Sequence, residues 1–175
     1  MSGAKIHLYV ACSLDGLIAR PDGAVDWLFT EGDYGYESFL SGIGTTLMGY
    51  KTFEVILGFG GVFPYQRLEN IVFTRSYDRA AHPDVRYVQE DMIGYIQKLK
   101  ARSSKDIWLV GGGEMVQQCH EAGLIDEYQL AVHPVLLGEG LPLFPGLKRQ
   151  QDLVLLSNKA HPKGLIQLHY RNKDA

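Results

Sequence analysis

Two glycine turns in this sequence have the residue types and the setting to bind phosphate. The first is MGYKT at residues 48–52, and the second is VGGGE at residues 110–114. In each, an apolar strand pattern ends at a glycine and a helical pattern begins, so unpaired backbone N–H groups at the positive end of a helix would face a ligand. Neither turn matches the G-x-G-x-x-G or G-x-x-x-x-G-K motif, which disfavours a Rossmann domain and a P-loop ATPase.

Other kinds of chemistry lack the residues they need. The six histidines show no metal-ligand spacing, and Ser13 has no nucleophile-elbow context. Cys12 and Cys119 lie in apolar or helical surroundings without C-x-x-C spacing, which is typical of reduced, buried thiols. We therefore expect neither a bound metal nor a covalent intermediate.

The composition is that of an ordinary globular domain. The chain has 175 residues, 46% hydrophobic and 21% charged, and no repeat or linker divides it, so we expect a single domain over residues 1–175. The net charge of −3 and the lack of a basic run argue against a nucleic-acid partner. No stretch approaches the ~20 apolar residues of a membrane span, and no signal-peptide pattern opens the chain. A cytoplasmic protein without a membrane partner is expected.

Hydrophobic periodicity predicts the elements that position the glycine turns. Alternation predicts a strand over residues 5–11, and the turn-rich residues 14–30 predict a long loop. Further strands are predicted at 45–48, 70–74, 85–88 and 107–110, helices at 51–57, 91–102 and 114–122, and strands again at 128–137, 153–156 and 165–170. This order predicts an α/β fold with one mixed sheet and helices on its faces.

Several segments, taken in their order, resemble dihydrofolate reductase across nearly the whole chain. They are ACSLDGLIA at 11–19, DW at 26–27, MGYKTF at 48–53, IVFTRS at 71–76 and VGGG at 110–113. Three more, SLDG at 13–16, GLIDE at 123–127 and PVLLGEG at 134–140, resemble the reductases of riboflavin biosynthesis. The resemblance implies a dihydrofolate-reductase-like three-layer fold, with a mixed, mostly parallel central sheet and helices on both faces.

The deaminase half of the bifunctional riboflavin enzymes has no counterpart in this sequence. The H-x-E and P-C-x-x-C motifs of that zinc enzyme are missing. The chain is therefore similar to a free-standing relative of the C-terminal reductase domain of those enzymes.

The resemblance also implies NADPH as the cofactor and the residues around it. Residues 49–52 would hold phosphates of the cofactor, and the strand end at 74–76 would hold its adenosine 2′-phosphate. Residues 112–116 would contact the pyrophosphate. Ala11 and the loop around Ile18, Gly23 and Ala24 would line the nicotinamide. A cis peptide bond would join Gly111 and Gly112. The implied cofactor residues are Ala11, Ile18, Gly23, Gly49, Tyr50, Lys51, Thr52, Thr74, Arg75, Ser76, Gly111, Gly112, Gly113, Glu114, Met115 and Val116.

Three departures from the dihydrofolate reductase pattern bear on the substrate. Tyr50 stands where those enzymes usually have Arg or Lys, and Arg75 and Lys51 could compensate for the missing charge. Gly35 stands where the folate-binding carboxylate belongs, and Leu68 where the arginine for the folate tail belongs. Folate is therefore not expected to be the substrate.

Three residues are candidates for catalysis or for contact with the substrate. Asp26 is the candidate catalytic residue, supplying a proton itself or through an ordered water, with a capping role as the structural alternative. Trp27 and Asp15 are candidate substrate contacts, and Asp15 has the simpler alternative of closing a turn with Gly16.

These expectations describe an NADPH-dependent oxidoreductase that transfers hydride to a C=N or C=O bond of a small heterocyclic or sugar-derived molecule. The resemblance points to 5-amino-6-(5-phosphoribosylamino)uracil reductase as the nearest activity. Two alternatives stay open: an NADP-binding module without turnover, and a divergent dihydrofolate reductase with Asp33 or Glu37 shifted into the pteridine pocket. Because relatives are often dimers, a homodimer is expected.

Overall fold

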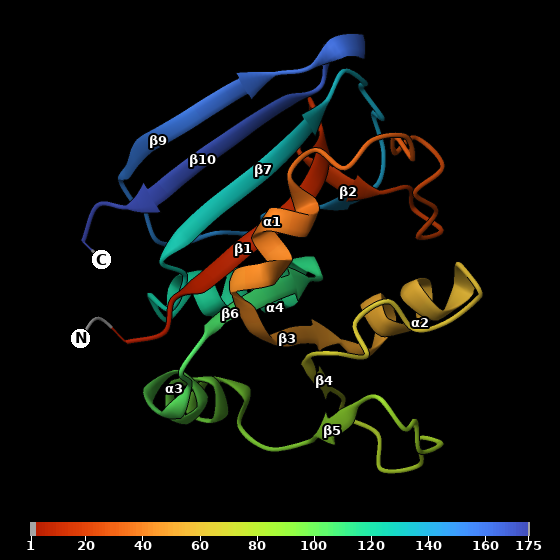
Figure 1. Cartoon of the computed structure of the whole chain (residues 1–175), viewed down its shortest axis with the longest axis vertical. Coiled ribbons are helices and arrows are strands. Elements are labelled where there is room, and N and C mark those ends of the chain that lie inside the picture. Colours follow the sequence, from red (N-terminus) through yellow and green to blue (C-terminus); the bar gives the residue numbers. More distant parts are fainter. Residues whose placement is uncertain (1–2, 175) are drawn as a thin grey trace.

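The computed structural model describes residues 3–174 and shows a sheet of eight strands between two layers of helices (Figure 1). The strand order is β5-β4-β3-β6-β1-β7-β10-β9. All pairings are parallel except the two that β10 makes, with β7 and with β9. The predicted α/β fold with a mostly parallel sheet is therefore confirmed.

Six strands run parallel, so their carboxyl ends meet at one edge of the sheet, where open α/β sheets bind their ligands. They are β1 (Ile6–Ser13), β3 (Ile43–Gly49), β4 (Glu69–Phe73), β5 (Arg86–Val88), β6 (Asp106–Gly111) and β7 (Glu127–His133). Both glycine turns follow strands of this set, because β3 ends at Gly49 and β6 at Gly111.

The C-terminal strands extend the sheet beyond β7. β10 (Ile166–Asn172) pairs with β7 and with the edge strand β9 (Leu153–Ala160), and a 3-10 helix (Pro162–Gly164) joins the two. A separate pair of short strands, β2 (Leu17–Ala19) and β8 (Leu141–Pro142), lies beside this sheet. The predicted C-terminal strands are thus confirmed.

Helices cover both faces of the sheet. α1 (Tyr36–Gly42) and α2 (Tyr50–Gly58) lie on one face, where Phe39 of α1 stacks on Tyr9 at 4.2 Å between ring centroids. α3 (Met92–Arg102) and α4 (Gly113–Glu121) lie on the other. Among residues 3–174, no helix is long and apolar enough to cross a membrane.

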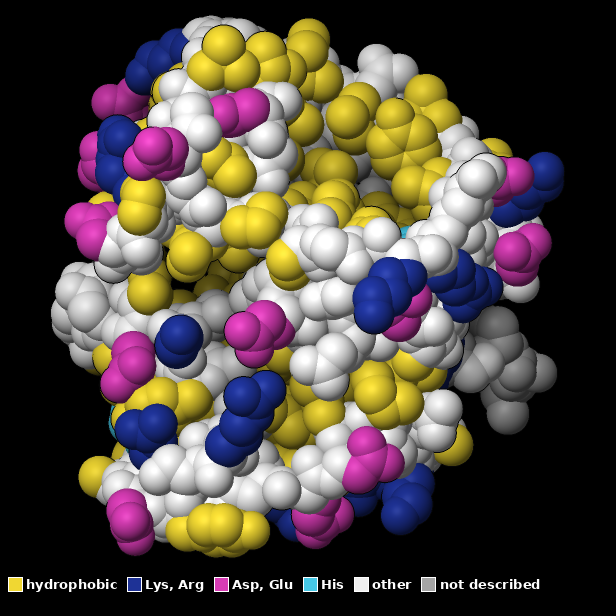
Figure 2. All heavy atoms as spheres, turned by 180° about the vertical axis from the view of Figure 1, so that it is seen from behind, with side chains coloured by type: hydrophobic (Ala, Val, Ile, Leu, Met, Phe, Trp, Pro, Cys, Tyr) yellow, Lys and Arg dark blue, Asp and Glu magenta, His cyan; other side chains and the backbone are white. Residues whose placement is uncertain are grey.

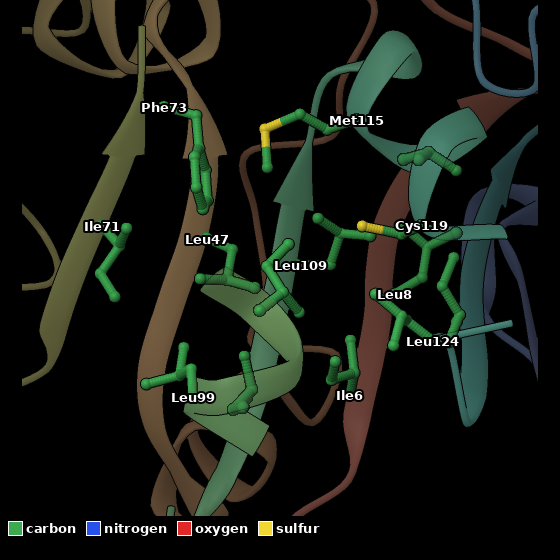
Figure 3. Close-up of a cluster of buried hydrophobic side chains, with 14 of the residues drawn as sticks. Ile6, Leu8, Leu47, Ile71, Phe73, Leu99, Leu109, Met115, Cys119 and Leu124 are labelled. Atoms are coloured by element: carbon green, nitrogen blue, oxygen red, sulfur yellow. The ribbon is translucent and has the colours of Figure 1, made fainter. Parts of the chain in front are cut away.

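The main core lies between the sheet and the second pair of helices. Figure 3 shows Leu8, Leu47 and Leu109 from neighbouring strands meeting side chains of α3 and α4. These three leucines are completely buried, and truncating such a residue to alanine costs about 2–5 kcal/mol. Cys12 and Cys119 belong to the same core as free thiols, and burial raises the pKa of Cys12 to about 11 and that of Cys119 to about 12. The prediction of two buried thiols is confirmed.

Some local predictions were wrong in detail. The segment 14–30 is not all loop, because β2 forms there by pairing with β8, a partner far along the chain. The helix α1 was missed because none of its residues is buried and its N-cap is Gly35. The strand predicted over 128–137 ends at His133, since Pro134 follows and the Val135 N–H donates to the His133 carbonyl.

Candidate functional site

The two glycine turns lie side by side because β3 and β6 are neighbours in the sheet. Met48 is the register partner of Gly111. A Cβ added to Gly112 would lie 3.3 Å from Thr52 Oγ1, and one added to Gly49 would lie 3.5 Å from Met115 Sδ. The starts of α2 and α4 therefore share one surface at the carboxyl edge of the sheet, and neither N-cap residue makes a side-chain capping bond.

The second turn leaves only part of its backbone free. The Gly111–Gly112 peptide is cis, as predicted. The N–H groups of Met115 and Val116 donate to the Gly112 carbonyl at 3.0 and 3.1 Å, and both side chains are buried in the core. Since the N–H groups of Gly113 and Glu114 have no backbone acceptor within residues 3–174, they are the better candidates for a phosphate.

The end of β4 brings a third predicted segment to the same surface. Arg75 is 94% exposed in its side chain, and its Nη2 lies 3.9 Å from Oε2 of Glu114 at the start of α4. Thr74 Oγ1 accepts a hydrogen bond from the Ser76 N–H at 3.2 Å, which holds the strand end in a turn. A loose, exposed ion pair of this kind contributes little, so the Arg75 guanidinium is available to a ligand.

Arg79 is a cation at this surface that the sequence analysis missed. Its guanidinium carbon lies 3.6 Å from the centre of the Tyr50 ring, and its Nε lies 3.5 Å from Thr74 Oγ1. Arg79 thus places a positive charge over Tyr50, the residue that stands where the resemblance to dihydrofolate reductase implies a cation. The contact joins a loop residue to the start of a helix far away in sequence, and no sequence motif predicts it. Lys51, next to Tyr50, is exposed.

The residues predicted around the nicotinamide come from the first strand and the following loop. Ala11 lies in β1 opposite Ala131 of β7, and Ile18 in β2 packs against the main core. Gly23, with φ of +87°, closes a turn in which its N–H donates to the Arg20 carbonyl. No hydrogen bond among the described residues joins that turn to the glycine turns, so the place of Gly23 at a cofactor stays a prediction.

Asp15 joins two loops. Its carboxylate accepts hydrogen bonds from Ser13 Oγ at 2.5 Å and from the N–H groups of Leu137 and Gly138 at 3.1 and 2.8 Å. These bonds, led by the one from Ser13, lower the pKa of Asp15 to about 2. The carboxylate therefore ties residues 13–17 to residues 135–138, which is a structural role, and contact with substrate stays a prediction.

Asp26 forms a two-point ion pair with Arg20. Its oxygens lie 2.6 Å from Arg20 Nε and 3.0 Å from Nη2, and this pairing lowers the pKa of Asp26. The carboxylate is therefore ionised at neutral pH, and the structure does not favour Asp26 as the group that itself gives up a proton. Orienting a water remains open to it.

Trp27 is partly buried and has a free donor. Its indole meets the ring of His133 edge to face at 5.2 Å, and its Nε1–H is buried without a hydrogen-bond partner among the described residues. His133 is held by the Phe29 N–H at 3.2 Å and by the Ala131 carbonyl at 3.1 Å, and burial lowers its pKa. Because an unpaired buried donor is costly, the Trp27 N–H is a group that a ligand or water would satisfy.

Comparison with curated proteins finds relatives over almost the whole chain. The chain is 38% identical over 169 residues to the uncharacterized protein YwjB of Bacillus subtilis, covering 95% of this chain and 97% of YwjB. It is 31% identical over 180 residues to YyaP of the same organism, covering 95% of this chain and 94% of YyaP.

Solved structures share the fold. A putative riboflavin biosynthesis protein from Shewanella sp. PV-4 superposes with a TM-score of 0.86 at 25% identity, covering 97% of this chain and 99% of the other. The Thermotoga maritima diaminohydroxyphosphoribosylaminopyrimidine deaminase/5-amino-6-(5-phosphoribosylamino)uracil reductase gives 0.72 at 17% identity, and this chain covers 57% of its length.

The fold is also that of dihydrofolate reductase, and the family assignment agrees. Enterococcus faecalis dihydrofolate reductase, complexed with NADP(H), gives a TM-score of 0.67 at 17% identity, covering 97% of each chain. The model of the RibD C-terminal domain matches residues 62–166, which include β4, the second glycine turn and β9 and end at the first residue of β10. The chain belongs to the RibD C-terminal domain family and has the dihydrofolate-reductase fold.

Proposed function

We propose that this protein is an NADPH-dependent reductase of a small heterocyclic or sugar-derived substrate, of the type represented by 5-amino-6-(5-phosphoribosylamino)uracil. The observation that carries the proposal is the convergence of both glycine turns and the end of β4 on one surface. The family and the printed activity of the Thermotoga maritima relative support the reductase class.

The residues at this surface fit a phosphate-rich cofactor. Gly112 leaves open the space beside Thr52 that a Cβ would fill, and Gly113 lets α4 begin against β8, since a Cβ there would lie 2.5 Å from the Pro142 carbonyl oxygen. The free N–H groups of Gly113 and Glu114 and the cations Arg75 and Arg79 would hold phosphate groups. NADPH, when bound, supplies the hydride.

The protein's own residues would bind the cofactor and the substrate, orient them, and position the water that delivers a proton. Ala11, Ile18 and Gly23 would line the nicotinamide, and Trp27 would offer its free N–H to the substrate. Asp26 would act through an ordered water, because Arg20 keeps its carboxylate ionised and its pKa low. Catalysis would then come mainly from positioning the two reactants.

Arg75→Ala is expected to lower NADPH affinity about 10- to 100-fold, the effect of losing a charged hydrogen bond of about 1.5–3 kcal/mol, and to leave NADH affinity nearly unchanged. The reason is that NADH has a ribose hydroxyl where NADPH has a 2′-phosphate. Titration of both cofactors by fluorescence measures this directly.

Arg102→Ala is the matched control for Arg75→Ala. Arg102 also makes an exposed ion pair with a 3.9 Å separation, to Glu69, but it lies at the end of α3. Its replacement should change neither the NADPH affinity nor the NADH affinity. Equal losses of NADPH and NADH in Arg75→Ala would instead assign Arg75 to adenine stacking or to the fold.

We also propose that the protein is a homodimer that pairs through β9 and the outer face of the C-terminal strands. Leu153, Leu155 and Ile166 are 40%, 49% and 43% exposed, and their register partners show that they share the face turned away from α1. Figure 2 shows that face, with hydrophobic side chains gathered over its upper part, where β7, β10 and β9 lie in Figure 1. An apolar edge strand with unpaired backbone groups is a template for a second copy.

Leu155→Glu is expected to convert the dimer to a monomer, because it places a charge in the apolar patch. Light scattering coupled to size-exclusion chromatography would report the mass of both proteins. Leu57→Glu, at a leucine of similar exposure (42%) on α2, is the control and should leave the mass unchanged. A monomeric wild type would refute the dimer.

A further inference from the structure

A groove lies on the sheet face that carries α1, over the C-terminal strands. Its volume is about 190 Å³, and α1 covers β1 in Figure 1 while the strands β7, β10 and β9 continue past it. This is room for several water molecules or a small polar group, and not for a whole cofactor. A groove of this size could form one part of a larger binding site.

The strand register connects the groove to the predicted nicotinamide wall. Ala11 of β1 is opposite Ala131 of β7, Ala131 is opposite Gln167 of β10, and Gln167 is opposite Lys159 of β9. Opposed residues lie on the same face of a sheet, so this row runs straight from Ala11 to Lys159. With strands about 4.8 Å apart, the row is roughly 14 Å long, which is the length of a small two-part molecule.

Small residues keep the near end of the groove open. Both Ala131 and Gly35 line it, and neither has a side chain that extends beyond Cβ. An opening therefore exists at this end of the groove. A substrate whose ring lies near Ala11 could extend through it toward β9.

The far end of the groove is positive. Lys159 makes no ion pair or hydrogen bond within the described part of the chain, and no carboxylate lines the groove. The nearby buried Glu127 is already matched by Lys5 at 2.6 Å and His169 at 2.7 Å. Asp33, on the Tyr9 side, accepts hydrogen bonds from the N–H groups of Gly35 and Glu37. Lys159 is thus left as a cation without a protein partner.

The remaining walls are held in place. Gln167 donates to the Tyr34 carbonyl at 2.8 Å, and its Oε1 lies 2.6 Å from His161 Nε2. Gln129 Nε2 lies 3.3 Å from His7 Nδ1. These bonds fix the amide groups on the floor, so that a ligand meets a preformed surface and little ordering is needed on binding.

We propose that this groove is a subsite for an oxyanion, a carboxylate or a phosphate, at the end of the substrate remote from the reduced bond, with Lys159 as its binding cation. The proposal rests on the reductase function for the statement that the rest of the substrate lies near Ala11. The anion site itself depends only on the groove.

The test follows the side-chain amide signals of Gln129 and Gln167 by NMR in ¹⁵N-labelled protein. Inorganic phosphate and acetate are titrated separately at constant ionic strength. Saturable shifts are expected with at least one anion in wild type, and the tighter anion identifies the group that the subsite prefers. Absence of a saturable shift with both anions overturns the proposal.

Substitutions at Lys159 test whether its ammonium group binds the anion. Lys159→Gln should weaken anion binding about tenfold, Lys159→Arg should retain it, and Lys98→Gln, which removes an exposed lysine on α3, should match wild type. Unchanged binding in Lys159→Gln would overturn the role of Lys159. NADPH titration of the wild-type sample separates the two proposals: saturable anion shifts without NADPH binding refute the reductase, and NADPH binding without saturable anion shifts refutes the subsite.

Discussion

Dihydrofolate is expected to be reduced at least 100-fold less efficiently by this protein than by a dihydrofolate reductase assayed in parallel. By the resemblance to those enzymes, Gly35 and Leu68 stand where two charged groups that hold folate would be expected. A charged hydrogen bond contributes about 1.5–3 kcal/mol, so the loss of two corresponds to about two to four decades in kcat/KM if they act independently.

Within residues 3–174, neither Asp33 nor Glu37 is placed to replace the missing carboxylate. Asp33 uses both oxygens on the backbone N–H groups of Gly35 and Glu37, where it stabilises the start of α1, and Glu37 is exposed. The alternative of a divergent dihydrofolate reductase therefore loses its two candidate residues. Absorbance at 340 nm measures the turnover, and NADPH binding in the same preparation shows that the cofactor site is intact. Turnover within tenfold of the reference enzyme would contradict the expectation.

Glu127→Ala is expected to lower the free energy of unfolding by about 3 kcal/mol, or about two decades in the unfolding equilibrium. Glu127 is 9% exposed and ties three elements together, through Lys5 before β1, His7 in β1 and His169 in β10. Removing it leaves these groups without their anion. The value is at the low end for a buried pair because the Lys5 side chain is half exposed.

Urea unfolding of wild type, Glu127→Ala and Glu90→Ala measures this effect, with the unpaired, exposed Glu90 as the control that should shift the value by less than about 0.5 kcal/mol. The pH dependence provides a second check. Burial alone would raise the pKa of Glu127, but the hydrogen bonds from Lys5 and His169 outweigh it and lower the pKa. The stabilisation is therefore present above the ordinary glutamate pKa and is lost as pH falls through the lower folded value. A difference between wild type and variant that grows on acidification would contradict this assignment.

Short-range patterns were enough to predict most of the framework. The alternation over residues 5–11 became β1, the apolar segments before each glycine turn became β3 and β6, and the acidic start and basic end of residues 91–102 became α3 with Asp91 as its cap. Asp91 accepts hydrogen bonds from the N–H groups of Ile93 and Gly94, a local contact that sequence spacing encodes.

Elements that depend on a distant partner were not predictable in this way. α1 buries no residue of its own and is held by Asp33 before it and by the Phe39–Tyr9 stacking below it. β2 exists only because β8 pairs with it. In both, the stabilising contact comes from outside the local window in which periodicity operates.

The sequence by itself determined that two strand–glycine–helix turns exist, that they could bind phosphate, and that the segments carrying them follow the order of a known reductase family. Only the tertiary structure decided that β3 and β6 are neighbours, so that the two turns lie on one surface, and that the Arg79 guanidinium lies over the Tyr50 ring. It also decided that the Asp15 carboxylate accepts hydrogen bonds that join two loops and that the Asp26 carboxylate pairs with Arg20. Lys159 likewise ends a row of opposed residues that begins at Ala11. The reason is physical: hydrogen bonds, ion pairs and grooves are set by distances between residues remote along the chain, which the packing of the sheet alone establishes.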